Sequence, residues 1–530
     1  MLADFKFDNR FLRSLPADDN SANYPRQVNG ACYTRVKPKM AHEPVLIAYA
    51  QEVAELLDLN QIDCQSEEFL QMVVGNKLLE GMDPFATCYG GHQFGNWAGQ
   101  LGDGRAINLG EVVNARNEHW NMQLKGAGPT PYSRMADGLA VFRSSVREFL
   151  CSEAMYHLGV PTTRALSLAL TGEQVMRDIF YDGNPALEPG AVVCRVSSSF
   201  LRFGHFEILA ARGELENLRK LADYALKTEF PDLIEGHKKI SKEHYAALFK
   251  AISSATLKMI IEWSRVGFVH GVMNTDNMSV AGLTIDYGPY GWMEDFDFDW
   301  TPNTTDAEGR RYCFGNQAGI GQWNLLQLAQ ALVTLTHDPA PFEAILAEYT
   351  TEYKQQWLIM MGNKLGLGKE GTKDQNETLF KELLEVLKRS DIDMTIFFRL
   401  LSKLSPGDST EKCFSIISDS YYDLDGLSAE DRGAMERWLF VYLERVRYEN
   451  VNKDERIDRM NAMNPLYILR NYLVQRAIEQ GELGDFSGIH DLLDLIRKPY
   501  EYQAGRDRFA EKRPEWARDK AGCSMLSCSS

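Results

Sequence analysis

The chain has 530 residues, 44% hydrophobic and 25% charged, which is typical of a folded protein large enough for several domain-sized units. Its 74 acidic residues outnumber the 57 basic ones, so the net charge is -17. Because this excess of negative charge repels a polyphosphate backbone, binding to nucleic acid over a broad surface is disfavoured, and no nucleic-acid partner is expected.

Membrane and targeting segments are not expected either. No apolar run approaches the roughly 20 residues that cross a bilayer, and the first residues lack the pattern of a leader peptide. The nine cysteines include no C-x-x-C pair, which argues against zinc ribbons. The sequence therefore predicts a cytoplasmic protein with no membrane partner. It also predicts a poorly packed tail from Pro499 that exposes Cys523 and Cys528 to redox chemistry.

Near the N-terminus, residues 1–85 carry short amphipathic segments and are expected to elaborate a larger domain. A glycine-rich tract follows over 89–105, which either approaches a ligand closely or forms a set of turns. Two strand-like runs come next, 106–113 and 120–125. A glycine-rich loop, two antiparallel strands and a lysine, here Lys125, follow one another in the N-lobe of protein kinases, where the lysine contacts phosphate oxygens.

A helix is predicted over 141–157, and it contains Glu148 in the place of the glutamate that pairs with the kinase lysine. Taken singly, Glu148 is better explained as a solvated helix position and Lys125 as a surface lysine. Together with the glycine-rich tract they predict a buried ion pair. Further strands are expected over 159–170 and 191–196.

Two arginines, Arg195 and Arg202, stand among apolar neighbours. Because an unpaired buried guanidinium is costly, each should have an anionic partner, either a carboxylate or a phosphate. Helical periodicity then covers 215–268 and most of 340–500.

The predicted fold class is α+β, a protein-kinase-like bilobal fold with two additions. Residues 1–85 form the N-terminal elaboration, and 86–214 form an N-lobe with the glycine-rich loop. Residues 215–340 form a C-lobe with a metal site, and 341–530 form a helical C-terminal extension that ends in the redox-capable cysteine tail.

The stretch from His270 to Gly288 resembles a kinase catalytic loop followed by the D-F-G motif. His270 takes the histidine position, Asn277 the metal-binding asparagine position, and Asp286 begins a D-Y-G sequence. The residue at the position of the catalytic aspartate is Val272, which can neither accept a proton nor orient a hydroxyl. Asp276 is the nearby carboxylate that could replace it.

A hairpin over 277–286 is expected to bring the Asn277 amide oxygen and the Asp286 carboxylate together. Such hard oxygen ligands suit Mg²⁺ or Mn²⁺. Taken alone, 274–277 could be an ordinary Asx-rich turn and Asp286 a strand end, but the joint spacing favours a metal site. The acidic run 294–299 is expected to be a loop rather than a second metal site.

Together these residues resemble the selenoprotein O (SelO) family, pseudokinases that act as protein adenylyltransferases. The resemblance extends from near residue 8 to the end of the chain. It rests on Gly90-Gly-His-Gln-Phe-Gly95, Leu101-Gly-Asp-Gly-Arg105, Leu124-Lys-Gly-Ala-Gly128, Thr130-Pro-Tyr-Ser-Arg134, Arg143-Ser-Ser-Val-Arg-Glu-Phe-Leu-Cys-Ser-Glu-Ala154, Asn274-Thr-Asp-Asn-Met278, Asp286-Tyr-Gly-Pro289, Met463-Asn-Pro465 and Cys528-Ser-Ser530.

The resemblance implies an inverted nucleotide pose in which the α-phosphate of ATP faces the acceptor. AMP would be transferred to a Ser, Thr or Tyr hydroxyl of a protein, with release of pyrophosphate, and UMP could be transferred from UTP. By position, Asp276 would be the proton acceptor, and Asn277 and Asp286 the metal ligands. The residues at the family's nucleotide contacts are Gly102, Gly104, Arg105, Lys125, Asp137, Gly138, Arg195, Arg202 and Asp286.

The sequence leaves open the disulfide partner of Cys528 and two alternative functions. In the family, the position of Cys528 holds selenocysteine in some members and a regulatory disulfide cysteine in others, and here Cys313 or Cys523 could be its partner. The alternative functions are a conventional protein kinase, opposed by Val272, and an inactive nucleotide-binding scaffold, opposed by the retained Asp276 and the other polar site residues.

Overall fold

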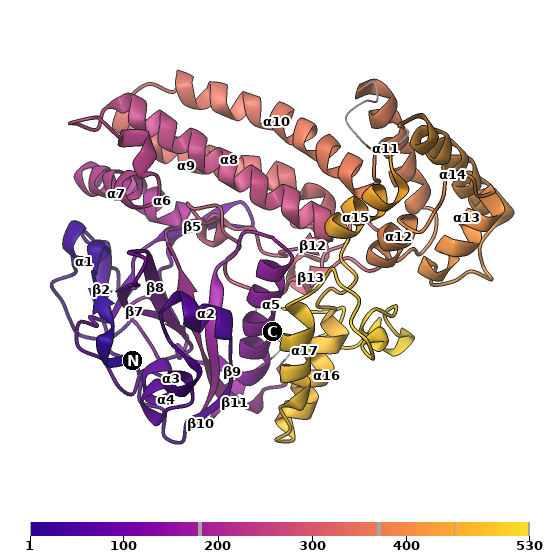
Figure 1. The fold of residues 1–530 in the computed structure, drawn as a ribbon. Helices are drawn as coiled ribbons and strands as arrows, with labels where there is room; N and C mark the ends of the chain where they lie inside the picture. Colours follow the sequence, from indigo (N-terminus) through magenta and orange to yellow (C-terminus); the bar gives the residue numbers. More distant parts are fainter. Residues whose placement is uncertain (1, 179–182, 368–372, 450, 528–530) are drawn as a thin grey trace.

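The computed structural model describes residues 2–178, 183–367, 373–449 and 451–527, and it combines a large sheet with many helices (Figure 1). The predicted mixture of α and β structure is therefore confirmed. Among the described residues, no helix has the length and apolar character needed to cross a membrane.

The large sheet has the strand order β2-β4-β7-β8-β11-β10-β3, with β1 added beside β7 and β9 beside β11, and its paired strands are antiparallel. Its strands are β1 (Lys6–Phe7), β2 (Tyr33–Arg35), β3 (Val45–Tyr49), β4 (Phe85–Thr87), β7 (Ala106–Val113), β8 (His119–Lys125), β9 (Ala140–Val141), β10 (Arg164–Arg177) and β11 (Ala186–Ser197). Two smaller ladders pair β5 (Gly90–Gln93) with β6 (Asn96–Gln100) and β12 (Phe268–Val269) with β13 (Gly291–Trp292).

The helices cover the sheet and form the second half of the chain, where α8, α9 and α10 lie together and α11–α15 form a separate group (Figure 1). They are α1 (Arg10–Ser14), α2 (Gln51–Leu56), α3 (Gln61–Cys64), α4 (Glu67–Val73), α5 (Phe142–His157), α6 (Phe203–Ala211), α7 (Leu215–Thr228), α8 (Lys242–Val266), α9 (Gln317–Thr336), α10 (Ala340–Lys364), α11 (Lys373–Leu387), α12 (Met394–Leu401), α13 (Thr410–Ile417), α14 (Ala429–Glu449), α15 (Lys453–Met463), α16 (Asn471–Glu482) and α17 (Ser487–Ile496).

Alternation along the strands decides which side chains meet α5. In β11, Val192 and Cys194 pack with helices α2 and α4, while Val193 packs in the core that contains α5. Because side chains of a strand alternate between faces, Arg195 shares the α5 face with Val193. Side chains alternate in the same way along β8, where Met122 and Leu124 face α2 and α4. Lys125 therefore lies on the α5 face.

Helix α8 leads directly into the stretch from His270 to Gly288. It ends at Gly267, whose φ of 73° is the left-handed conformation that glycine adopts at helix C-termini, with its N–H bonded to the Trp263 carbonyl. Strand β12 follows at once, and its pairing with β13 brings together the two ends of the segment 270–290. The helix cap and this short ladder therefore set where the segment begins and ends.

The prediction of a poorly packed tail is wrong for its last described residues, 517–527, although many side chains over 501–511 are exposed. Leu526 is fully buried and pairs its backbone with Thr304, whose N–H donates to the Leu526 carbonyl at 2.8 Å. Cys523 is buried, burial raises the pKa of its thiol to about 11, and its carbonyl accepts a hydrogen bond from Asn471. A buried, protonated thiol is a poor nucleophile, so Cys523 is not the exposed redox group that was expected. Cys528 lies outside the described residues.

Candidate active site

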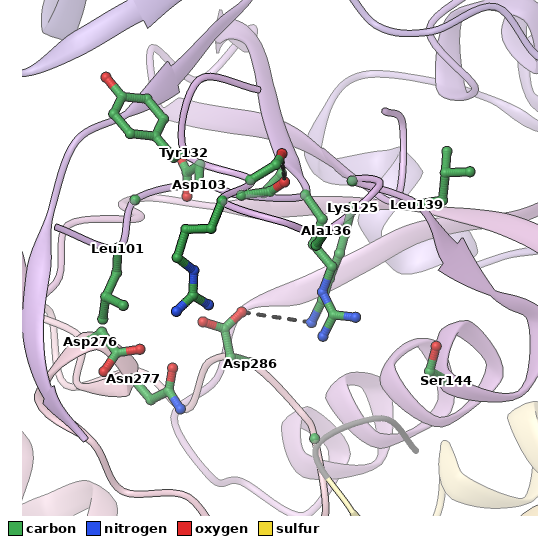
Figure 2. A pocket seen from close by; sticks show the side chains of 18 of the residues that line it. Leu101, Asp103, Lys125, Tyr132, Ala136, Leu139, Ser144, Asp276, Asn277 and Asp286 are labelled. Carbon is green, nitrogen blue, oxygen red and sulfur yellow. Dashed lines mark hydrogen bonds and ion pairs between the residues drawn. The ribbon is translucent and has the colours of Figure 1, made fainter. Parts of the chain in front are cut away.

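The predicted nucleotide and metal residues line one cavity of about 640 Å³ between the large sheet and the segment 270–290 (Figure 2). Its walls include Gly102, Gly104, Arg105, Lys125, Asp137, Gly138, Arg195, Arg202, Asp276, Asn277 and Asp286. Glu148 does not line the cavity and lies behind Lys125. Folding therefore brings together residues that are up to 184 positions apart in the sequence, from Gly102 to Asp286.

The glycine-rich loop fits closely against the segment that contains Tyr132. A Cβ atom added to Gly102, which has a φ of 80°, would lie 2.5 Å from the Tyr132 ring, and one added to Gly104 would lie 3.0 Å from the Tyr132 carbonyl. Between the two glycines, Asp103 is buried and accepts hydrogen bonds from the Thr87 N–H and hydroxyl at 2.9 and 2.6 Å. The glycines are thus explained by close packing as well as by ligand approach.

Lys125 and Glu148 form the expected buried ion pair. Arg195 joins it, because its Nη1 lies 3.0 Å from Glu148 Oε1 and 2.7 Å from Asp286 Oδ1. Arg202 pairs with the other Asp286 oxygen and also donates to the Asp276 carbonyl at 2.7 Å. The sequence left open whether the two arginines pair with a carboxylate or a phosphate. They share the Asp286 carboxylate, and Arg195 also pairs with Glu148.

The charges of this cluster favour an anion in the cavity. Burial by itself would raise the pKa of Asp286, but Arg202, Arg195 and Lys125 outweigh it and hold that pKa well below the usual range. The cluster then has three cations and two carboxylates, and it leaves one positive charge unbalanced. Burial lowers the pKa of Lys125 despite both carboxylates, so an incoming phosphate would further stabilise its charged form.

Asp286 is held in an unusual backbone conformation. Its φ is 56°, in the left-handed region that residues other than glycine seldom occupy. The predicted hairpin over 277–286 is not formed: Ser279 pairs with Arg202, and Thr284 pairs with Thr162. The prediction was wrong because both limbs of this segment pair with other parts of the chain. Asn277 and Asp286 nevertheless line the same cavity.

His270 links the two ends of this segment. Its Nε2 donates to the Ile285 carbonyl at 2.8 Å, next to Asp286, and its Nδ1 accepts from the Val272 N–H at 3.4 Å. Burial lowers the pKa of His270, which keeps the ring neutral and in the tautomer that these two bonds require. His270 thus acts in the architecture of the site, and it is absent from the cavity wall.

Asp276 and Asn277 lie side by side at one end of the cavity, in a 3₁₀ turn over Thr275–Asn277 (Figure 2). Burial raises the pKa of the Asp276 carboxyl to about 7, against the opposing effect of Arg202. The Asn277 amide donates to the Val272 carbonyl at 2.9 Å, which leaves its oxygen as a potential ligand. Val272 itself lines the cavity and offers no carboxylate.

A divalent cation fits this donor set. The Asn277 oxygen and the Asp286 carboxylate are hard ligands on one cavity, as Mg²⁺ and Mn²⁺ prefer. No cluster of three or more His, Cys, Asp or Glu side chains that could hold a metal occurs among the described residues. The acidic run 294–299 is a loop, as predicted, and in it Glu294 and Asp295 pair with Arg513, at 3.2 and 2.8 Å.

The cavity wall also contains residues that were not predicted, and Gln93, Arg177 and Tyr132 are three of them. Gln93 and Arg177 line the cavity, and Arg177 holds both carboxylate oxygens of Asp137 at 2.8 Å. Tyr132 also lines it and packs against the glycine-rich loop. Gln93 and Tyr132 lie in motifs that carry the family resemblance, but nothing in their local sequence indicates a contact with Asp276 or Gly102.

Comparison with known proteins agrees with this geometry. A family model described as "Protein adenylyltransferase SelO" matches residues 22–497. The chain belongs to the SelO family. A SelO relative from Rhodopirellula baltica, named protein nucleotidyltransferase YdiU, is 53% identical, with full coverage of both chains. Relatives with the same name from an Azoarcus species and from Flavobacterium johnsoniae are 53% and 50% identical, with at least 99% of both chains covered.

The predicted family is thereby confirmed. The predicted class of enzyme, a protein nucleotidyltransferase, agrees with the family description and with the names of the relatives. Neither a conventional protein kinase nor an inactive scaffold is favoured. Membership of the SelO family implies a nucleotide as one substrate and a protein as the other.

A first prediction concerns Glu148, which pairs with Lys125 and Arg195 on the side away from the cavity. Glu148→Gln is expected to lower the free energy of unfolding by about 3 kcal/mol, because two buried cations lose a shared carboxylate. Chemical denaturation measures the loss. The matched control is Glu216→Gln, which removes an exposed pair with Lys220 and should leave the free energy of unfolding nearly unchanged. Equal effects of the two substitutions would contradict the buried cluster.

Proposed function

We propose that this chain is a protein adenylyltransferase that transfers AMP from ATP to Ser, Thr or Tyr hydroxyls of proteins and releases pyrophosphate. The observation that carries the proposal is the position of the one carboxylate in the segment 270–277 that could act as a base. Val272 stands where a kinase has its catalytic base, and the carboxylate of Asp276 lies on the same cavity beside Asn277. UTP is a second candidate donor.

The proposed fold is kinase-like and bilobal, with the ranges 1–85, 86–214, 215–340 and 341–530 as its parts. It is supported by an antiparallel sheet that carries Lys125 and by helix α5, which presents Glu148 to that lysine. The helices α6 to α17, which follow the large sheet in the chain, also support it. A cytoplasmic location stays a prediction from the sequence, and a redox role of Cys528 stays what the resemblance implies.

In the proposed reaction the acceptor hydroxyl oxygen attacks the α-phosphorus of ATP. A new oxygen–phosphorus bond forms, the bond from the α-phosphorus to the bridging oxygen breaks, and pyrophosphate leaves. Asp276 takes the proton of the hydroxyl. Lys125, Arg195 and Arg202 bind and orient the phosphate oxygens with the excess positive charge of their cluster.

A divalent cation, Mg²⁺ or Mn²⁺, would be held by Asn277 and Asp286. When bound, it would neutralise charge on the phosphate oxygens as pyrophosphate leaves. Arg195 and Arg202 each donate to one oxygen of the Asp286 carboxylate, and each oxygen keeps a further lone pair that could bind the cation.

The test uses ATP labelled at one phosphate at a time. The purified protein with Mg²⁺ or Mn²⁺ should transfer label from [α-³²P]ATP, and none from [γ-³²P]ATP, to itself or to proteins of a bacterial extract. Pyrophosphate should form in equal amount. Transfer from the γ position would identify a kinase instead. Transfer from neither position in an extract that a SelO relative labels would support the inactive scaffold.

A further inference from the structure

Gln93 of the β5–β6 hairpin lines the cavity beside Asp276, and the hairpin packs against helix α6 and the turn Thr275–Asn277. The two strands pair only with each other among the described residues. The His92 N–H donates to Thr275 Oγ1 at 2.7 Å, and the Phe94 N–H donates to Asn274 Oδ1 at 3.2 Å. The hairpin is thus bonded to the two residues that precede Asp276.

Glycine at position 91 lets this hairpin approach the carboxylate itself. A Cβ atom at Gly91 would lie 2.8 Å from Asp276 Oδ1 and 2.9 Å from its Cβ, too close for any other residue without a shift. On the far side, His92 Nδ1 lies 2.5 Å from Glu207 of helix α6. The hairpin is therefore held between α6 and the loop, with its backbone against Asp276.

Gln93 is the hairpin side chain that reaches into the cavity. Its Nε2 donates to Asp276 Oδ2 at 3.4 Å, at the long end of the hydrogen-bond range. Among the described residues, this is the one side-chain hydrogen bond to the Asp276 carboxylate. The other oxygen of that carboxylate, Oδ1, is buried against Gly91 and has no hydrogen-bond partner among these residues. The orientation of the carboxylate thus depends on Gln93 and on the backbone at Gly91.

We propose that Gln93 is a positioning residue for the transfer: its amide orients the Asp276 carboxylate toward the acceptor hydroxyl. The inference rests on the proposed function, in which Asp276 accepts the acceptor's proton. One N–H of Gln93 occupies one lone pair of Oδ2 and leaves another for the incoming O–H. Gln93 forms and breaks no covalent bond, and the transferred proton stays on Asp276.

Two substitutions at Gln93 separate the effect of the amide donor from the effect of side-chain size. Gln93→Met keeps the length of the side chain and removes the donor, and Gln93→Glu keeps the shape and puts a carboxylate beside Asp276. The kcat of AMP transfer should fall by about ten- to a hundredfold in Gln93→Met and further in Gln93→Glu, because a misoriented base loses this much. The KM for ATP and the melting temperature should stay near wild type.

The control is Asn96→Ala on the same hairpin, where the exposed Asn96 side chain donates to the Phe94 carbonyl at 3.3 Å. It should keep wild-type kcat. Wild-type kcat in Gln93→Met would overturn the inference, and so would a parallel change of kcat, KM and melting temperature, which would indicate a packing role. These outcomes are distinct from failure of the proposed function, in which the wild-type protein itself transfers no α-label.

Discussion

Asp286→Ala is expected to lower AMP transfer by about a thousandfold or more. The substitution removes a proposed metal ligand, and the charge stabilisation that a catalytic cation supplies is worth several kcal/mol in the transition state. It also removes the carboxylate that Lys125, Arg195 and Arg202 share. The measurement is the initial rate of label transfer from [α-³²P]ATP at saturating Mg²⁺ or Mn²⁺.

Nucleotide binding separates the two effects of this substitution. Without metal, Asp286→Ala should bind ATP at least as tightly as wild type, because three cations then lack a carboxylate and attract the phosphates. The metal-dependent gain in affinity should disappear in Asp286→Ala and shrink in Asp286→Asn. Normal transfer by Asp286→Ala would refute the assigned metal site, whatever its affinity for ATP.

Asp276→Asn is expected to reduce AMP transfer by about a hundred- to ten-thousandfold, which is the usual contribution of a general base. The amide keeps the size of the side chain and the contact with Gln93, but it cannot accept the proton of the acceptor hydroxyl. The rate of α-label transfer measures the loss. Affinity for ATP should change little, since the cationic cluster around Asp286 remains intact.

The control for this substitution is Asp299→Asn, an exposed aspartate of the acidic run after the D-Y-G sequence. It should leave transfer and ATP affinity unchanged. Full transfer activity in Asp276→Asn would remove Asp276 from the role of base. The opposite deviation is also informative: a large loss of ATP affinity would mean that Asp276 acts mainly in nucleotide binding.

Individual strands and helices of the site could be predicted from the local sequence, but the pairing of distant segments could not. The strand that ends at Lys125 and the helix that contains Glu148 were both predicted. The two side chains meet because Lys125 lies on the face of β8 that packs against the buried helix α5. The hairpin β5–β6 was not predicted, because glycine-rich tracts specify turns without specifying which strands pair. Its contact with Asp276 joins positions 183 residues apart and leaves no local signal.

The same limit explains the error in the tail. Composition indicated a charged, weakly packed segment from Pro499, yet Leu526 and Cys523 are buried against residues more than 50 positions away. Short apolar segments within a charged stretch acquire partners only when the rest of the chain presents a surface and unpaired backbone groups. Periodicity cannot supply that information, since it reports only on neighbours within one element.

By itself, the sequence determined the family and the displaced carboxylate in the segment from His270 to Gly288. Both are properties of residue type and of spacing within short motifs, which folding does not alter. Only the tertiary structure decided that Arg195 and Arg202 pair with Asp286, across 91 and 84 residues. The reason is physical: a buried guanidinium requires an anion, but which anion it meets depends on the packing of distant elements.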